Sequence, residues 1–507
     1  MNTFPVIVLH SEDGVAVTRG ALPPGTPVAD GVTTTARIPP GHKVALRAHA
    51  SGEAVRKYGQ VIGFTTAPVA AGEHVHTHNL GMGDFSRDYA FGVDARPTEP
   101  LTPPATFMGI RRPDGQAATR NYVGILTSVN CSAHVATLVA DAFRRHPVLH
   151  LDPLAEHPHV DGVVALTHKT GCGMGSGEPL RVLRRTLAGY ARHPNFSHIV
   201  MVGLGCEVNQ LDEMVDEHGL RGRVRSMNIQ TMGGTRRTVE AGIEFVQDVL
   251  AEADAVRRMP VPASELKLAL QCGGSDGYSG VSANPALGVA SDLLVRHGGT
   301  VILSETTETY GAEHLFTRRA RSREVGEKLV GLMRWWEEYT HRAGITIDSN
   351  PSPGNKAGGL TTILEKSLGA MAKAGSTDLV DVVGYAEKVT GPGFVFMDTP
   401  GYDPVSATGQ VAGGANVVCF TTGRGSVFGC KPAPSIKVAT NTPLFRRLEE
   451  DMDINCGTVL DGTETVAEAG ARIFDHLLRV AGGERTKSEE NDFGGAEFAP
   501  WQLGATV

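Results

Sequence analysis

The sequence predicts an α/β protein in which a small β-rich segment precedes two blocks of alternating strands and helices. Short runs rich in valine and isoleucine, such as GVAVTRG and KVALRAHA, fill residues 1–80 and are separated by Pro/Gly turns. From residue 108 onwards, apolar strand-like runs alternate with helix-like stretches, which is typical of parallel sheets. The 507 residues are too many for one hydrophobic core, so several domains are expected.

Composition narrows the class of protein. Hydrophobic residues make up 41% of the chain and charged residues 20%, which suits a soluble globular protein. The net charge of -8 argues against nucleic-acid or acidic-membrane partners. No run of 18 apolar residues and no signal-peptide pattern occurs, so we expect a cytoplasmic protein without a membrane span. Seven irregularly spaced cysteines do not resemble a secreted disulfide framework.

The β-rich segment ends in a row of histidines. In a strand, His74, His76 and His78 would alternate onto one face, where they would form a metal-binding row or, alternatively, a solvated polar edge. The proline-rich residues 81–107 follow and lack any hydrophobic period, so we expect a linker there. The first domain is therefore expected at residues 1–80.

The first α/β block is expected at residues 108–258. Its strands end in polar turns that lead into helices, as in the run YVGILTS. The predicted strands are 122–128, 162–167 and 198–204, and the predicted helices are 133–143, 179–191, 210–216 and 239–256.

The second block, residues 259–507, contains the glycine-rich stretch QCGGSDGYSGVSANPALG at 271–288. It follows a buried-strand pattern at 266–270 and precedes a helix pattern, which is where α/β proteins hold ligands. Free backbone N–H groups at such a helix start can bind an anion, although an ordinary βα loop is the alternative. The other predicted strands are 300–303, 394–397 and 415–421, and the predicted helices are 286–295, 325–343 and 463–481.

Four cysteines, Cys131, Cys172, Cys206 and Cys272, each follow an apolar strand. The carboxyl ends of parallel strands meet at one edge of a sheet, so the four thiols could converge there; chance placement is the alternative. Thiolates with a nearby histidine suit iron, zinc or an iron–sulfur cluster. His168, four residues before Cys172, fits as a ligand or a general base.

Other strand-end turns carry charged residues. Glu305 and Glu308 follow the strand TVIL and are candidate acids or metal ligands, or else a solvated helix start. Arg424 follows the strand ANVVCF and could hold a carboxylate through two parallel hydrogen bonds. Lys356 lies in a glycine-rich loop as an anion contact or a base. No phosphate-binding glycine motif is present, which disfavours nucleotide chemistry.

Several motifs together resemble the altronate/galactarate dehydratase family over nearly the whole chain. In order they are GHKVAL (41–46), KYG (57–59), HVHTHN (74–79), GLGCE (203–207), CGGSDGYSGVSANP (272–285), PSPGNKAGG (351–359), TTGRGS (421–426) and MDIN (452–455). The resemblance implies a hydro-lyase that converts a sugar acid into its 2-keto-3-deoxy product. It also implies an N-terminal SAF-type domain before two Rossmann-like α/β domains, and a divalent metal, with Fe²⁺ favoured and Mn²⁺ possible.

Dehydration next to a carboxylate needs a base, an acid and stabilisation of an enolate. We expect His168 or Lys356 as the base and Glu305 in the catalytic group. Substrate binding is expected at Ser275, Asp276, Asn284, Arg424 and His42. The metal is either a single ion held by histidines and carboxylates or an iron–sulfur cluster on the cysteines; the candidate ligands are His74, His76, His78, Cys131, Cys172, Cys206 and Cys272.

The motifs give conflicting indications of the substrate. HVHTHN resembles altronate dehydratases, whereas GVSANPALGVASDLLV and DMDINCGT resemble the galactarate branch, and we favour altronate. A sulfolactate sulfo-lyase of the same family is built from separate chains, unlike this one. The alternative of another class is a non-catalytic carbohydrate-binding or regulatory protein. A small-molecule sugar acid and a second copy of the chain, forming a homodimer, are the expected partners.

Overall fold

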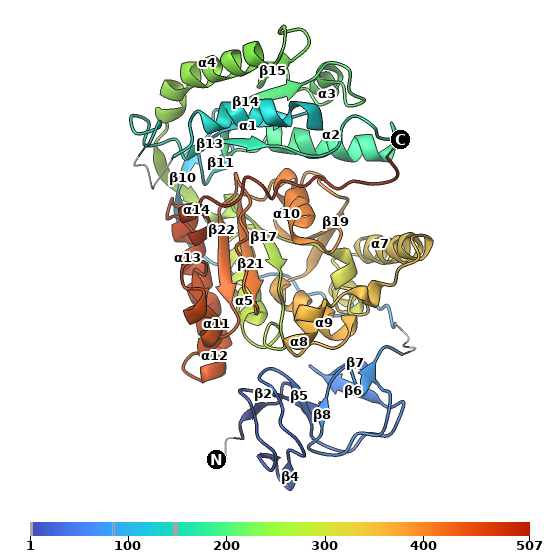
Figure 1. The fold of residues 1–507 in the computed structure, drawn as a ribbon. Coiled ribbons are helices and arrows are strands. Elements are labelled where there is room, and N and C mark those ends of the chain that lie inside the picture. The colour runs from blue at the N-terminus through green and yellow to red at the C-terminus, as the bar shows by residue number, and fades with distance from the viewer. Residues whose placement is uncertain (1–3, 84, 86, 146–150, 507) are drawn as a thin grey trace.

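The computed structural model describes residues 4–83, 85, 87–145 and 151–506. Three bodies follow one another along the molecule (Figure 1): the β-rich N-terminal domain, a seven-stranded sheet with its helices, and a four-stranded sheet with its helices. The last residues return along the four-stranded sheet, where Thr506 forms a bridge with Met174. This arrangement confirms the predicted α/β class with a β-rich N-terminal domain.

The N-terminal domain is built from short antiparallel strands around a valine-rich core. Val15, Val44, Val55 and Val75 are each at most 1% exposed, because branched side chains pack well on pleated surfaces. One sheet has the order β1-β2-β5-β8, a second has β6-β7-β9, and β3 pairs with β4. The bounds are β1 Val6–Ile7, β2 Val15–Thr18, β3 Pro27–Ala29, β4 Val32–Thr33, β5 Lys43–Ala45, β6 Ala54–Lys57, β7 Gln60–Thr65, β8 His74–Val75 and β9 Leu80–Gly81.

A small antiparallel sheet carries the chain into and out of the four-stranded domain. Strand β10 (Thr106–Arg111) lies between β11 (Ala117–Ala118) and β16 (Arg258–Pro262). The domain boundary predicted between residues 258 and 259 falls within β16, which contains Pro260 and Pro262. Prolines are tolerated on an edge strand, which is the place that β16 takes.

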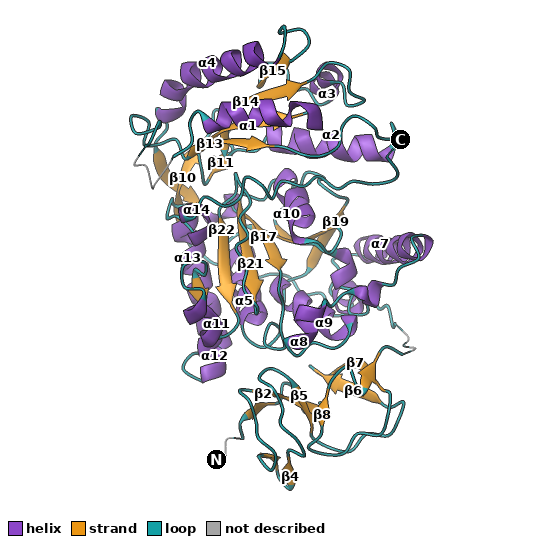
Figure 2. Ribbon diagram, viewed as in Figure 1, coloured by secondary structure: helices purple, strands orange, loops and turns teal. Residues whose placement is uncertain are grey.

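The four-stranded sheet is parallel, with the order β13-β12-β14-β15. Helices α1 and α4 cover one face, and α2 faces the middle body, where it packs against α10 (Figure 2). The strands are β12 Tyr122–Thr127, β13 Gly162–Leu166, β14 Phe196–Gly203 and β15 Val224–Asn228; the helices are η1 Asn130–Ser132, α1 Ala133–Asp141, α2 Glu178–Ala191, α3 Leu211–Glu217 and α4 Thr235–Asp254.

The seven-stranded sheet is also parallel, with the order β19-β20-β18-β17-β21-β22-β23. Its strands are β17 Lys267–Cys272, β18 Thr300–Leu303, β19 Leu379–Val383, β20 Gly393–Met397, β21 Val417–Thr422, β22 Ser435–Ala439 and β23 Ile454–Asn455. Strands that follow β17 go first to one side of it and then to the other. The strand order therefore reverses beside β17, and ligands bind at such reversals outside the carboxyl ends of the strands.

Helices cover both faces of this sheet and one end of it. α5, α9 and α13 pack on one face and α10 on the other, and α7 contacts the edge strand β19. The helices are η2 Ala263–Glu265, α5 Ala283–Arg296, η3 Thr306–Glu308, α6 His314–Arg318, α7 Arg323–Arg342, η4 Ile347–Ser349, α8 Pro353–Ala357, α9 Ile363–Met371, η5 Ala372–Ala374, α10 Asp403–Ala412, α11 Thr442–Arg447, α12 Gly457–Asp461, α13 Val466–Ala481 and α14 Lys487–Glu490. Within the described residues, no helix has the length and hydrophobicity that a membrane crossing needs.

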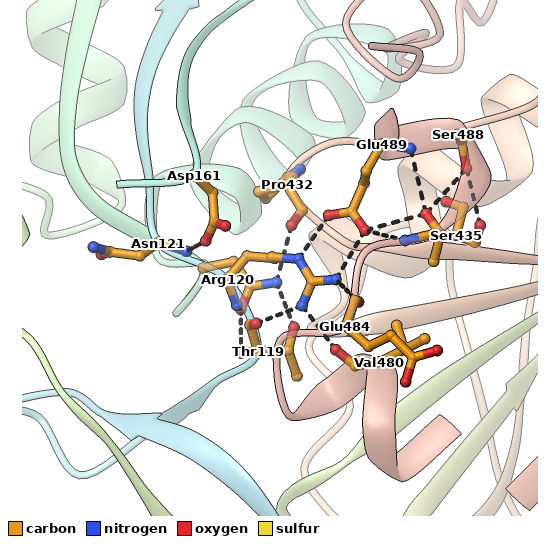
Figure 3. A network of polar contacts seen from close by, with 12 residues as sticks. Thr119, Arg120, Asn121, Asp161, Pro432, Ser435, Val480, Glu484, Ser488 and Glu489 are labelled. Atoms are coloured by element: carbon orange, nitrogen blue, oxygen red, sulfur yellow. Dashed lines mark hydrogen bonds and ion pairs between the residues drawn. The ribbon is translucent and has the colours of Figure 1, made fainter. Parts of the chain in front are cut away.

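A buried ion pair joins the two α/β bodies (Figure 3). Arg120, just before β12, donates from Nε and Nη2 to the Glu489 carboxylate of α14 at 2.6 and 2.8 Å. Its Nη1 donates to the Val480 carbonyl at 2.8 Å. The Thr119 and Glu484 carbonyls also accept from its guanidinium group, each at 2.8 Å. Because Arg120 is 1% exposed, these buried partners stabilise its charge in place of water.

A second buried ion cluster fixes the N-terminal domain against the seven-stranded body. Lys43 of β5 and Lys57 of β6 donate to the two carboxylate oxygens of Glu365 on α9, at 2.8 and 2.9 Å. All three side chains are at most 1% exposed. Burial by itself would raise the pKa of Glu365, but the two ammonium groups outweigh burial and lower it.

We expect Arg120→Met to lower the free energy of unfolding by about 3–5 kcal/mol, because the variant leaves the Glu489 carboxylate buried without its partner. Arg144→Met is the matched control, because Arg144 pairs with Asp492 at the surface and both side chains are more than half exposed. That control should change stability by at most about 1 kcal/mol. Urea unfolding of both variants measures the difference, and equal midpoints would contradict it.

Candidate functional site

A buried cluster of charged residues lies at the carboxyl ends of the central strands. Cys272 ends β17, Glu305 and Glu308 follow β18, and Asp403 begins α10 after β20. Lys366 of α9 and Lys373 of η5 complete what we call the acid–lysine cluster, which consists of Cys272, Glu305, Glu308, Lys366, Lys373 and Asp403.

The members of the acid–lysine cluster are close to one another. Lys366 Nζ lies 2.7 Å from the Glu308 carboxylate, and Lys373 Nζ lies 3.6 Å from Glu305. One ligand atom from each of Cys272, Glu305 and Glu308 falls within 4.8 Å of the others. The cluster thus combines acids, cations and a thiol in one water-poor place.

Burial and neighbouring charges shift the pKa values of these groups by different amounts. Burial raises the pKa of Glu305 well above its usual value, with the Glu308 charge adding to the effect, so the protonated form of Glu305 is favoured. Burial and Glu308 raise the pKa of Asp403 to about 7. Burial opposes the charge of Lys373, but the neighbouring Cys272 and Glu305 outweigh it and raise the lysine pKa. The cluster therefore holds a proton donor, a group poised at neutral pH and fixed positive charge.

Several polar atoms of the cluster lack partners. Among the described residues, four buried atoms of the cluster have no hydrogen-bond partner: both carboxylate oxygens of Glu305, Glu308 Oε2 and Lys373 Nζ. Glu305 also has a left-handed backbone, with φ of 66°. Unpaired buried polar atoms and left-handed non-glycine residues both reduce stability, and such strain concentrates at functional sites.

A second group, the histidine trio, lies on the N-terminal domain and consists of His42, His74 and His76. His42 Nδ1 lies 3.0 Å from His74 Nε2, and the rings of His74 and His76 stack with centroids 5.4 Å apart. His42 Nε2 lies 3.3 Å from the Ala357 carbonyl of α8, so the trio faces the seven-stranded body.

The histidine trio is suited to a divalent metal. One ring nitrogen from each histidine lies within 4.8 Å of the others, and His76 Nδ1 is buried without a partner in the described structure. Burial lowers the pKa of all three, to about 4 for His74 and about 3 for His76, so the rings are neutral at pH 7. Neutral imidazole nitrogens are the form that binds Fe²⁺ or Zn²⁺.

The predicted strand does not extend through the histidine row. β8 ends at Val75, and the Asn79 side chain closes a turn by accepting from His76 N and donating to the His74 carbonyl. His78 is exposed but still packs against His74, with centroids 5.4 Å apart. This turn, rather than alternation along a strand, brings the rings of His74, His76 and His78 together.

The N-terminal domain packs closely against glycines of the seven-stranded body, one in the stretch after β17 and one after α8. A side chain at Gly277 would place its Cβ 1.9 Å from the Gly41 carbonyl oxygen, and one at Gly359 would place it 2.4 Å away. Gly41 directly precedes His42. The absence of side chains here therefore allows the histidine trio to approach the sheet.

The predicted substrate-binding residues divide into two kinds. Ser275 is buried, with its Oγ unpaired in the described residues, whereas Arg424 is exposed and donates its backbone N–H to Gly274. Asp276 accepts from Thr440 and Asn441, and Asn284 bonds to the Gly369 carbonyl and Thr421. Asp276 and Asn284 therefore have internal partners that fix the loops.

The two residues predicted as bases lie in different bodies. His168 is buried beside the four-stranded sheet, where its Nε2 lies 2.9 Å from the Thr127 carbonyl and its Nδ1 accepts from Thr170 N. Backbone groups thus occupy both ring nitrogens. Lys356 is half-buried in α8, next to the residue that His42 contacts. Its position is compatible with a contact to an anion near the histidine trio.

The four strand-end cysteines do not share one sheet. Cys131, Cys172 and Cys206 are exposed and follow β12, β13 and β14, whereas Cys272 is buried on the seven-stranded sheet. Burial raises the pKa of the Cys272 thiol to about 11. The expectation that all four converge would require one sheet, and the chain forms two.

Lys366, Lys373 and Asp403 are not among the site residues predicted from the sequence. The two lysines are seven residues apart in LEKSLGAMAKAG, a spacing that places them on one side of a helix. Asp403 stands in GYDP after a predicted strand, which is the position used for the other candidates. The spacing of the two lysines and the position of Asp403 could have identified them. The acids near them, Glu305 and Glu308, come from a distant segment of the chain.

Comparisons with known proteins agree along the whole chain. Three family models match: Altronate/galactarate dehydratase SAF domain at residues 4–83, D-galactarate dehydratase/Altronate hydrolase, second domain at 109–254, and D-galactarate/Altronate dehydratase, C-terminal at 263–506. The chain is 40% identical to galactarate dehydratase (L-threo-forming) of Escherichia coli (strain K12) over 94% of its length and 93% of that protein. It is 34% identical to altronate dehydratase of Bacillus subtilis (strain 168) and 35% identical to that of Escherichia coli (strain K12), each over 99% of both chains.

We expect His76→Ala to weaken the binding of Fe²⁺ or Mn²⁺ by about tenfold or more, since even a lost hydrogen bond to a metal ligand costs 10–100-fold. Anaerobic titration calorimetry measures the affinity. The exposed His341 provides a control, because His341→Ala should bind metal normally. Unchanged affinity in His76→Ala, together with loss of binding in Glu308→Gln, would assign the metal to the acid–lysine cluster instead.

Proposed function

The chain belongs to the altronate/galactarate dehydratase family, and we infer that it is a hydro-lyase that removes water from a sugar acid. The end-to-end similarity to two kinds of sugar-acid dehydratase carries this conclusion. The acid–lysine cluster supports an enzymatic function, because a carbohydrate-binding protein does not need buried acids with raised pKa values. We propose that the product is the 2-keto-3-deoxy acid.

We place proton transfer on the acid–lysine cluster. The α-proton of a carboxylate is weakly acidic, and a base with a pKa near the working pH removes it best. Asp403 meets this condition. Burial raises the pKa of Glu305 well above its usual value, so Glu305 is suited to protonate the β-hydroxyl as it leaves. The two carboxyl groups thereby take opposite roles because their surroundings differ.

The two lysines supply fixed positive charge. Removing the α-proton places negative charge on the substrate carboxylate, and buried cations stabilise that charge more strongly than water does. Lys366 is held by Glu308 and by Asn350 Oδ1, at 2.7 and 2.8 Å. Lys373 has no hydrogen-bond partner among the described residues and is therefore the cation available to a substrate oxygen.

We propose that the histidine trio holds one divalent ion, with Fe²⁺ favoured. The two ammonium groups of the acid–lysine cluster disfavour a divalent cation there. The histidine trio instead offers neutral imidazole nitrogens as metal ligands, and His76 Nδ1 has no hydrogen-bond partner among the described residues. A bound divalent ion would act as a Lewis acid toward substrate oxygens. His42 of the N-terminal domain contacts α8, the helix that carries Lys356, and both residues would orient an anionic group there.

Two substrates follow from the relatives. The 40% identity to a galactarate dehydratase exceeds the 34% and 35% identities to altronate dehydratases, which favours a six-carbon dicarboxylate. The HVHTHN row favours altronate in the sequence comparison. We propose galactarate first and altronate second.

A direct assay tests the function. Purified protein with added Fe²⁺ should form a 2-keto-3-deoxy acid from galactarate or from altronate, detected as a thiobarbiturate-reactive product and by mass spectrometry. Product from galactarate alone would establish the dicarboxylate preference. If no hexonate or hexarate gives product, the carbohydrate-binding alternative replaces the enzyme.

Asp403→Asn should lower kcat by about 10²–10⁴, because the variant lacks the proton acceptor. In the wild-type protein, kcat/KM should fall about tenfold for each pH unit below pH 7, since Asp403 acts only when deprotonated and its pKa is raised to about 7. Initial rates from pH 5 to about 9 measure this acid limb.

The control is Asp381→Asn, which changes a half-exposed aspartate of β19 that pairs with Lys328. Its activity should be unchanged. Asp403→Asn should also be more stable than the wild type above pH 7, because a raised carboxyl pKa means that folding disfavours the ionised form. An active Asp403→Asn protein would remove this residue from the mechanism.

A further inference from the structure

Three exposed cysteines lie side by side at one edge of the four-stranded sheet. Of the seven cysteines, Cys131, Cys172 and Cys206 are exposed and the other four are buried. They follow β12, β13 and β14, which are adjacent parallel strands in the order β13-β12-β14. Parallel strands end at the same edge, so the three loops leave the sheet together.

Backbone hydrogen bonds tie the three loops to one another. Asn130 N, next to Cys131, donates to the Thr170 carbonyl at 3.0 Å. Asn209 N, three residues after Cys206, donates to the Gly171 carbonyl at 3.0 Å, and Gly171 precedes Cys172. The Asn209 side chain closes the third side by donating to the Ser128 carbonyl at 3.0 Å.

Two glycines and a buried carboxylate fix these loops. Gly171 has φ of 104°, and a Cβ there would lie 2.4 Å from the Ser128 carbonyl oxygen. Glu207, which is 3% exposed, accepts from Ser128 Oγ and from Gly205 N, both at 2.6 Å. The loops are thus closely packed and internally satisfied while their thiols face outward.

Outward-facing thiols are unusual, because free cysteine is among the most buried residue types. Cys131 lies in η1, directly before α1, and Cys206 Sγ accepts from Gln230 Nε2 at 3.4 Å. Packing does not account for exposed cysteines on three adjacent loops, whereas binding of a thiophilic group does.

We propose that Cys131, Cys172 and Cys206 bind an iron–sulfur cluster. Iron–sulfur clusters are held by cysteine thiolates. A single zinc ion needs its ligand atoms close together, and the described groups whose ligand atoms all lie within 4.8 Å of one another do not include these cysteines. A cluster instead spreads its thiolates over several irons. Three protein thiolates leave one iron of a four-iron cluster open to a small molecule.

The site is separate from the residues to which we assign dehydration. Cys272, with the rest of the acid–lysine cluster, lies on the seven-stranded sheet, and the histidine trio lies on the N-terminal domain. The proposal therefore does not rest on the proposed function, and its readout is cofactor content rather than activity.

Anaerobic reconstitution of the full chain with iron and sulfide tests this proposal. The wild-type protein should bind iron and acid-labile sulfide in equal amounts and show the visible absorption and, once reduced, the electron paramagnetic resonance of a cluster. Cys131→Ser, Cys172→Ser and Cys206→Ser should each reduce bound sulfide by about tenfold or more. Cys419→Ala, at a buried position of β21, is the control and should retain the cluster.

Circular dichroism establishes that each variant is folded, as expected for changes at exposed positions. Three results would overturn the proposal: no sulfide bound by the wild-type protein, normal sulfide in all three folded serine variants, or one zinc ion per chain without sulfide. Loss of sulfide in all four variants, the control included, would also overturn it.

Discussion

The carboxylate of Glu365 is the interaction on which the arrangement of the site depends. It is fully buried, and Lys43 and Lys57 of the N-terminal domain balance its negative charge. The residues next to this cluster belong to the site: His42 directly precedes Lys43, and Lys366 directly follows Glu365 and pairs with Glu308. The ion cluster therefore joins the strand next to His42 to α9, the helix that also carries Lys366 of the acid–lysine cluster.

The acid–lysine cluster retains unpaired polar atoms that a fold selected for stability alone would lose. Both oxygens of Glu305 and the ammonium group of Lys373 are buried without hydrogen bonds in the described residues. Such groups reduce stability, and the ion pairs Lys366–Glu308 and Lys373–Glu305 hold the cluster together. The electrostatic preorganisation that a dehydration requires is thus built into the folded chain.

Much of the fold could be predicted because its signals are local. The pattern of residues 300–303 predicts a strand and that of residues 325–343 a helix, and the structure contains them at Thr300–Leu303 and Arg323–Arg342. The edge strand at 258–262 could not be recognised, because prolines hide its pattern. The turn after Val75 was also missed, since a single asparagine side chain forms it.

By itself, the sequence determined the three-domain α/β class, the family, and the positions at strand ends where polar residues gather. Hydrophobic period and motif order encode these properties along the chain. Only the tertiary structure decided which of those positions meet. It separated Cys272 from the other three cysteines by forming two sheets, occupied both nitrogens of His168 with backbone, and brought Lys373 and Asp403 to Glu305. The reason is physical: contacts between distant segments, and the pKa shifts that burial causes there, depend on strand order and domain docking.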